Sequence, residues 1–262
     1  MISFIPPIES PGLPESRSNE GEVEELSPIL LTRLAFDLIA AGLLLFGFSY
    51  WWLGNTAHEV AGTALFLLLA VHNVFNRRFY KRFAKTHGDV RGLFNIAVTL
   101  ALLVAIVALL VTSVLISNTL SGFISLHGGF TLRQIHTLAA YWALVIVAVH
   151  LGLRWPMIMA VTRNLAGITR PSAIRAWPLR LTAVAIAVHG VWSSFELGLG
   201  PKLAMQVTLY WWNFEESVAG FFVHCIAIAG LYISLTYYTM RAIQHWKCSH
   251  HHKRGYEPRR AI

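Results

Sequence analysis

The chain has 262 residues, of which 55% are hydrophobic and 13% are charged, and its formal net charge is +8. Soluble domains carry about 25% charged residues, so this composition excludes an ordinary soluble protein and indicates an integral membrane protein. The two cysteines, Cys225 and Cys248, occur in no CxxC or CxxCH motif. We therefore expect neither a disulfide framework nor covalent attachment of a c-type haem.

Residues 1–29 are polar, acidic and proline-containing. They lack a basic segment followed by a short apolar core, so we predict no cleavable signal peptide. The interpretation that we favour for this segment is a disordered, solvated arm.

Six apolar stretches follow, and each is long enough to cross a bilayer, which takes roughly 20 residues of helix. In chain order they cover residues 30–53, 57–76, 92–117, 134–153, 181–199 and 217–240. Strands of a membrane barrel would be about half this length with alternating polarity, so we predict an all-α integral membrane protein with six transmembrane helices. The expected organisation is a four-helix core at 30–155, a connection with helices five and six at 156–240, and a basic tail at 241–262.

The basic residues are concentrated in alternate connections. Residues 77–91 contain six Lys and Arg, residues 154–180 contain five and residues 241–262 contain six, whereas the opposite side has only Arg133 and Lys202. This asymmetry follows the positive-inside rule and predicts that both termini are cytoplasmic. The net charge then reflects topology and contact with anionic lipid, rather than a nucleic-acid-binding surface.

Two tryptophan pairs fall where interfacial aromatic residues are expected. Trp51 and Trp52 end the first predicted span, and Trp211 and Trp212 precede the sixth. Both pairs are therefore predicted to anchor the outer membrane interface.

Two spans carry histidines with the same spacing. The stretch HEVAGTALFLLLAVH runs from His58 to His72, and HTLAAYWALVIVAVH runs from His136 to His150. Fourteen residues fall about 40° short of four full helical turns, so both histidines of a span share one face, about 21 Å apart along the axis. The second and fourth spans run in the same direction, so His58 and His136 lie near the outer end and His72 and His150 lie deeper.

If these two helices face each other, their histidines form two level pairs. Each pair could bind one six-coordinate iron from both sides, which is the requirement of a b-type haem. The residues one turn below the outer histidines are small, as a closely approaching porphyrin would require: Ala61, Gly62, Ala139 and Ala140. Small residues also serve helix packing in membranes, so they support the haem interpretation only in part.

Other interpretations of the histidine pairs stay open. Each imidazole could hydrogen-bond a neighbouring helix, or the pairs could line a metal-ion or proton path in a transporter. Zinc sites usually use closer spacings with carboxylate or thiolate ligands, and only Glu59 is nearby. The predicted spans contain no proline and no clear inverted repeat, which argues against a transporter.

His189 and His224 lie near the middle of the fifth and sixth predicted spans. They could contact haem propionates, a quinone head group or each other, and they are the natural substitutes if one of the four ligands is wrong. An interhelical hydrogen bond is the interpretation that we favour.

Several charged residues have weaker functional interpretations. Arg133, three residues before His136, either pairs with a propionate of the outer haem or marks a helix end, and His127 lies in the same connection. Asp37 is favoured to pair with Arg33, four residues earlier on the same helix, over a role in proton or quinol chemistry.

The remaining polar clusters are expected at the membrane surfaces. Three carboxylates lie near the outer ends of spans five and six: Glu196, Glu215 and Glu216. We interpret them as interfacial charge, with docking of a redox partner as the alternative. The tail could bind metal through His245, Cys248 and His250 to His252, but a basic, solvated cytoplasmic tail is favoured.

The paired histidine helices resemble the haem-bearing pair of the cytochrome b four-helix core. With the closing segment YWWNFEESVAGFFVHCIAIAGLYISLTYY, they resemble the flavinylation-associated membrane cytochromes of bacteria, over residues 31–240. The resemblance implies a protein of the bacterial inner membrane with two non-covalent b-type haems. It assigns their ligation to His58, His72, His136 and His150.

The resemblance also implies electron transfer across the membrane, between a quinol or cytoplasmic donor and an extracytoplasmic partner that carries flavin mononucleotide. The connections of this chain are too short to hold flavin, so the flavin is expected on another protein. Bis-histidine ligation leaves no open iron position, so we expect an electron-transfer subunit rather than a stand-alone enzyme, with no catalytic residue. A haem-bearing anchor of a larger oxidoreductase is an alternative.

Overall fold

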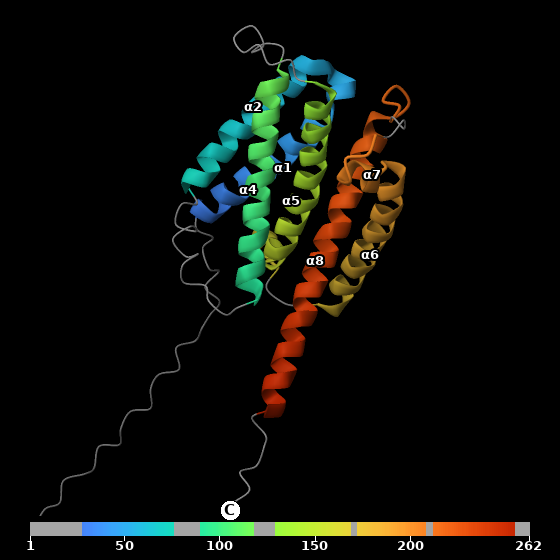
Figure 1. Cartoon of the computed structure of the whole chain (residues 1–262). Coiled ribbons are helices and arrows are strands. Elements are labelled where there is room, and N and C mark those ends of the chain that lie inside the picture. Colours follow the sequence, from blue (N-terminus) through green and yellow to red (C-terminus); the bar gives the residue numbers. More distant parts are fainter. Residues whose placement is uncertain (1–27, 76–89, 118–128, 169–171, 208–211, 255–262) are drawn as a thin grey trace, which may run out of the picture.

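The computed structural model describes residues 28–75, 90–117, 129–168, 172–207 and 212–254. The described parts of the chain form seven helices and no strand. Their bounds are α1 Pro28–Gly47, α2 Tyr50–Phe75, α4 Val90–Ile116, α5 Phe130–Leu165, α6 Ala173–Glu196, α7 Leu199–Leu203 and α8 Val218–Arg254. In Figure 1 three helix pairs lie side by side, α1 with α2, α4 with α5, and α6 with α8. The prediction of an all-α architecture is therefore confirmed for the described residues.

Five helices are long and apolar enough to cross a membrane: α1, α2, α4, α5 and α8. The chain is thus a multi-pass membrane protein by length and composition. Helix α6, which covers the fifth predicted span, is 24 residues long but is not among the five. Its basic start at Arg175 and Arg180 and its polar residues near Glu196 lower its mean hydropathy.

The structure corrects the first predicted span. Helix α1 ends at Gly47 rather than at residue 53, and α2 begins at Tyr50. Inside α2, Gly54 has φ 78° and ψ −177°, a conformation that is essentially restricted to glycine. Trp51 and Trp52 therefore belong to the start of α2, before this kink, and their side chains are exposed. Trp211 lies outside the described residues.

Two later helices are longer than expected. Helix α5 continues from Phe130 through Pro156 to Leu165, beyond the predicted end at residue 153. Helix α8 continues to Arg254 and extends past the rest of the bundle in Figure 1. The side chains of residues 247–254, and residues 255–262, lie outside the described part of the tail.

Two apolar clusters share α5. One joins α1, α2, α4 and α5 through Leu44, Leu65, Ala105, Leu109, Ala139 and Ala143. The other joins α5 to α7 and α8 through Tyr141, Leu144, Val145, Leu199, Phe221, Cys225 and Ile228, together with Leu197. Helix α5 is thus the central element that connects α1, α2 and α4 to α8.

The short helix α7 is tied to α5 by polar contacts. The ammonium of Lys202 donates a hydrogen bond to the Tyr141 hydroxyl at 3.0 Å and lies 4.8 Å from the centroid of that ring. The Trp142 indole donates to the Leu203 carbonyl at 3.2 Å. Burial lowers the pKa of Lys202 from its ordinary value, because an ammonium loses hydration there.

Helix α8 packs closely on both α5 and α6 at glycines. A Cβ atom on Gly152 would lie 2.7 Å from the Thr236 Cβ, and one on Gly190 would clash with the Ala227 carbonyl oxygen. Membrane helices use small residues to bring their backbones together in this way.

Replacing Gly190 with valine is expected to destabilise the α6–α8 pair by about 1–3 kcal/mol, as overpacking typically does. The measurement is the midpoint temperature of unfolding in detergent. Gly42→Val in α1 is the matched control, because a Cβ there meets nothing within 4 Å. An equal loss of stability in both variants would contradict the close approach at Gly190.

Candidate functional site: two histidine pairs between α2 and α5

The outer histidines meet across α2 and α5. The ring centroids of His58 and His136 lie 5.8 Å apart, with the ring planes inclined at 70°. An imidazole nitrogen binds a first-row metal at about 2 Å, so two imidazoles on opposite sides of one iron have centroids about 6 Å apart. The separation therefore matches what shared axial ligation requires.

Helices α2 and α5 are not among the closely packed helix pairs of the described chain. Helix α2 packs mainly on α1, whereas α5 packs mainly on α4 and α8. The histidines of α2 and α5 thus reach towards each other between helices whose backbones are not in close contact. A flat cofactor between two helices needs such a separation.

Hydrogen bonds set the tautomer of His58. Its Nδ1 lies 2.7 Å from the Gly47 carbonyl oxygen, and because a carbonyl can only accept, Nδ1 carries the proton. The Gly47 carbonyl is one of those left without an intrahelical partner by the end of α1. In a neutral imidazole the lone pair is then on Nε2, which is the nitrogen that a metal would bind.

His136 has the same tautomer through a side chain. The Thr112 hydroxyl donates to the Ala108 carbonyl at 2.6 Å, so its oxygen accepts from His136 Nδ1 at 2.9 Å. The Nε2 lone pair is again left for a ligand. Metal-ligating histidines almost always have their second nitrogen fixed in this way.

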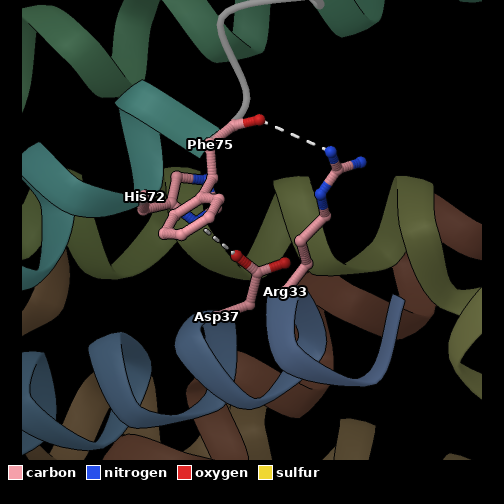
Figure 2. A network of polar contacts seen from close by, with 4 residues as sticks. All are labelled: Arg33, Asp37, His72 and Phe75. Carbon is pink, nitrogen blue, oxygen red and sulfur yellow. Dashed lines mark hydrogen bonds and ion pairs between the residues drawn. The ribbon is translucent and has the colours of Figure 1, made fainter. Parts of the chain in front are cut away.

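The two histidines of the inner pair, His72 and His150, differ in the contacts of their Nδ1 atoms. His72 Nδ1 lies 3.1 Å from the Asp37 carboxylate on α1 (Figure 2), so an ionised Asp37 places the proton of the neutral ring on Nδ1 as well. His150 is close enough to His72 to interact with it electrostatically. Its Nδ1 is buried and has no hydrogen-bond partner.

The contact of Asp37 corrects a prediction. The expected local pair with Arg33 is not the contact that the structure shows, because the carboxylate faces His72 instead (Figure 2). The Arg33 guanidinium donates to the Phe75 carbonyl at 3.4 Å. Carbonyls in the last turn of a helix lack intrahelical partners, and the end of α2 brings one within reach of Arg33.

Arg154 also belongs to this inner cluster. It lies one turn after His150 on α5 and interacts electrostatically with His150 and Asp37. In the sequence Arg154 is one of the basic residues that indicate topology, and its four-residue spacing from His150 is the signal that could identify it as part of this cluster. The Nε atoms of Arg33 and Arg154 are buried and, like His150 Nδ1, lack a partner. Buried polar atoms are normally hydrogen-bonded, so these three nitrogens indicate a site for an acceptor-rich group.

The small residues beside the outer pair have different surroundings. Ala61 and Ala139 are buried, and Ala139 packs in the core of the first four helices. A Cβ on Gly62 would meet nothing within 4 Å, so open space adjoins it. The side chain of Arg133 is exposed, and His127 lies outside the described residues.

His189 and His224 meet each other between α6 and α8. Their rings stack at a centroid distance of 5.4 Å and an angle of 20°. His224 Nδ1 is hydrogen-bonded to Ser193 Oγ at 2.8 Å, and Trp192 and Trp212 contact its ring edge-on. The contact between His224 and Ser193 is an interhelical hydrogen bond of the kind favoured from the sequence, and His189 stacks on the same ring.

The carboxylates and the tail form no larger ligand set in the described chain. Glu215 and Glu216 are exposed, and Glu196 interacts electrostatically with His224. Glu59 accepts a hydrogen bond from Ser117 at 3.2 Å. No group of three or more His, Cys, Asp or Glu side chains is placed to hold a metal ion within the described residues. Zinc needs three or four protein ligands, whereas a haem iron takes at most two.

Comparisons of the chain with protein-family models, with curated proteins and with solved structures found no match.

Proposed function

We propose that this protein is a di-haem b-type cytochrome that carries electrons across the membrane. The observation that carries the proposal is the outer pair, His58 and His136, with a centroid distance of 5.8 Å and both Nδ1 atoms hydrogen-bonded. The inner pair, His72 and His150, lies about 21 Å further along the same two helices, and His72 Nδ1 lies 3.1 Å from the Asp37 carboxylate there.

The residues around both pairs fit a haem. The Nε2 lone pairs of His58 and His136 are directed by their Nδ1 partners, and the open space beside Gly62 leaves room for a flat ring. At the inner pair, the buried Nε–H groups of Arg33 and Arg154 would donate hydrogen bonds to haem propionates. When bound, each haem supplies a reversible one-electron carrier, and two axial histidines leave no open position for substrate at the iron.

The topology belongs to the same proposal. Helix α6 packs along α8 (Figure 1) and would form the fifth of six spans despite its lower hydropathy. With six spans, the excess of Lys and Arg in alternate connections would orient both termini towards the cytoplasm. The protein would then lie in a bacterial inner membrane. The electrons would pass between a quinol or cytoplasmic donor and an extracytoplasmic flavin mononucleotide protein.

The first experiment is a reduced-minus-oxidised absorption spectrum of the purified chain from a haem-replete host, with haem counted by pyridine haemochrome assay. We expect b-type α-bands and about two haems per chain. Protein without haem would refute the proposal.

A proton or metal-ion transporter is the second candidate, and the Asp37–His72 contact at 3.1 Å is the observation that favours it. Intramembrane carboxylate–histidine contacts occur in proton relays. This candidate predicts no haem spectrum and a proton flux that Asp37→Asn abolishes in vesicles. A haem-bearing anchor subunit, by contrast, would contain haem but would transfer electrons only together with its partner enzyme.

Replacing Gly62 with leucine is expected to weaken binding of the outer haem by about tenfold, through overpacking of the space that the ring would occupy. The fold should tolerate the change, because a Cβ at Gly62 meets nothing within 4 Å. The measurements are the haem content and the unfolding temperature of each variant, so that loss of haem can be distinguished from loss of stability. Gly42→Leu in α1, which also points into open space, is the control. Full haem content in Gly62→Leu would contradict a ring beside this glycine.

A further inference from the structure

Two adjoining cavities lie at the inner end of the bundle, beyond the inner histidine pair. One, of about 380 Å³, lies between α4, α5 and α8. The other, of about 360 Å³, lies between α4 and α5. Arg91, Leu153 and Pro156 line both, so the two cavities adjoin, and we treat them together as one recess at the end where basic residues are concentrated.

The walls of this recess are both basic and apolar. Arg91 and Arg241 line the larger cavity from α4 and α8, and His245 adds a third basic group. Arg154 lines the smaller cavity. Neither cavity is lined by Asp or Glu in the described residues, so the lining carries net positive charge.

The neutral lining residues complete an amphipathic site. Tyr237 and Gln244 offer polar groups in the larger cavity and Asn95 does so in the smaller one. Leu153 and Met240 provide apolar wall. A free anion would use only the basic part of such a surface, whereas a lipid would use both parts.

We propose that this recess binds the phosphate group of an anionic phospholipid, with the acyl chains against its apolar wall. Basic recesses between transmembrane helices on the cytoplasmic side are typical of such head-group sites. Arginine suits the phosphate because its planar fork binds two oxygens at once. The assignment depends on the cavities, on their charges and on the cytoplasmic orientation proposed for this end of the bundle, and not on the haem proposal.

The test is native mass spectrometry of the purified full chain in detergent, titrated with phosphatidylglycerol or with phosphatidylcholine of the same acyl chains. Wild-type protein should retain phosphatidylglycerol preferentially. Arg241→Gln should weaken that retention by about fivefold, as expected for one arginine beside anionic lipid. Arg91→Gln should act similarly, and Arg241→Lys should lose less affinity than Arg241→Gln, because the charge remains although the bidentate fork is lost.

Arg163→Gln is the matched control. Arg163 lies in the last turn of α5, near the same end, and lines neither cavity. Unchanged retention in Arg241→Gln and Arg91→Gln, an equal loss in Arg163→Gln, or equal binding of phosphatidylcholine would overturn the proposal. Displacement of the lipid by millimolar inorganic phosphate would show that the recess binds free phosphate rather than a phospholipid head group. Haem content, recorded on the same samples, should not change, which separates this test from that of the proposed function.

Discussion

Replacing His136 with alanine should lower the haem content of the purified chain from two to one. His136 and His58 form the outer pair, with ring centroids 5.8 Å apart. Replacing either one with alanine would therefore leave the outer iron with one axial ligand. Alanine favours the helix, and the change should leave α5 intact. The measurement is the pyridine haemochrome count, together with the α-band that disappears from the difference spectrum.

The stacked pair His189 and His224 supplies the control for this experiment. These two rings contact each other, and His224 is hydrogen-bonded to Ser193. His189→Ala should therefore retain both haems, whereas His72→Ala or His150→Ala should lose only the inner one. Two haems in His136→Ala, or loss of one in His189→Ala, would show that the ligands have been assigned to the wrong pair.

Replacing Asp37 with asparagine should raise the midpoint potential of the inner haem by about 60 mV or more. Asp37 Oδ1 lies 3.1 Å from His72 Nδ1, so a negative charge on Asp37 would make the imidazole a stronger donor to a haem iron and would favour the oxidised state. Removing partners of this kind typically costs 10–100-fold in metal affinity. For a one-electron couple, a tenfold change in the ratio of affinities for the two oxidation states is about 59 mV.

The outer haem is the internal control for Asp37→Asn. Its proposed ligands, His58 and His136, are oriented by Gly47 and Thr112 rather than by Asp37, so its potential should stay unchanged in the same redox titration. Asp37→Asn keeps the side-chain volume, so a merely structural role would leave both potentials unchanged. Equal shifts of both haems, or none, would contradict the assignment of Asp37 to the inner site.

The pairing of the histidines could be predicted because it depends only on periodicity. Fourteen residues return a helix to nearly the same face, and two spans separated by one crossing run in the same direction. Those two rules place His58 level with His136, and the structure brings these residues together. Their role as haem ligands stays a prediction.

The surroundings of the histidines could not be predicted from the chain. Asp37 had a candidate partner, Arg33, on its own helix, but the packing of α1 against α2 brings its carboxylate to His72. The carbonyl that orients His58 is available because α1 ends at Gly47, six residues before the predicted end of the first span. Arg154 joins the inner cluster only because α5 brings it beside Asp37 of α1.

By itself the sequence determined the class of protein, the apolar segments, and the register of the four histidines. Composition and helical periodicity are local properties, which hold whatever the neighbouring helices are. Only the tertiary structure decided where the first helix breaks, which atom each Nδ1 contacts, and how closely α8 approaches α5 and α6. Those features depend on how each helix is rotated and placed against its neighbours, and packing of side chains from distant segments sets that placement.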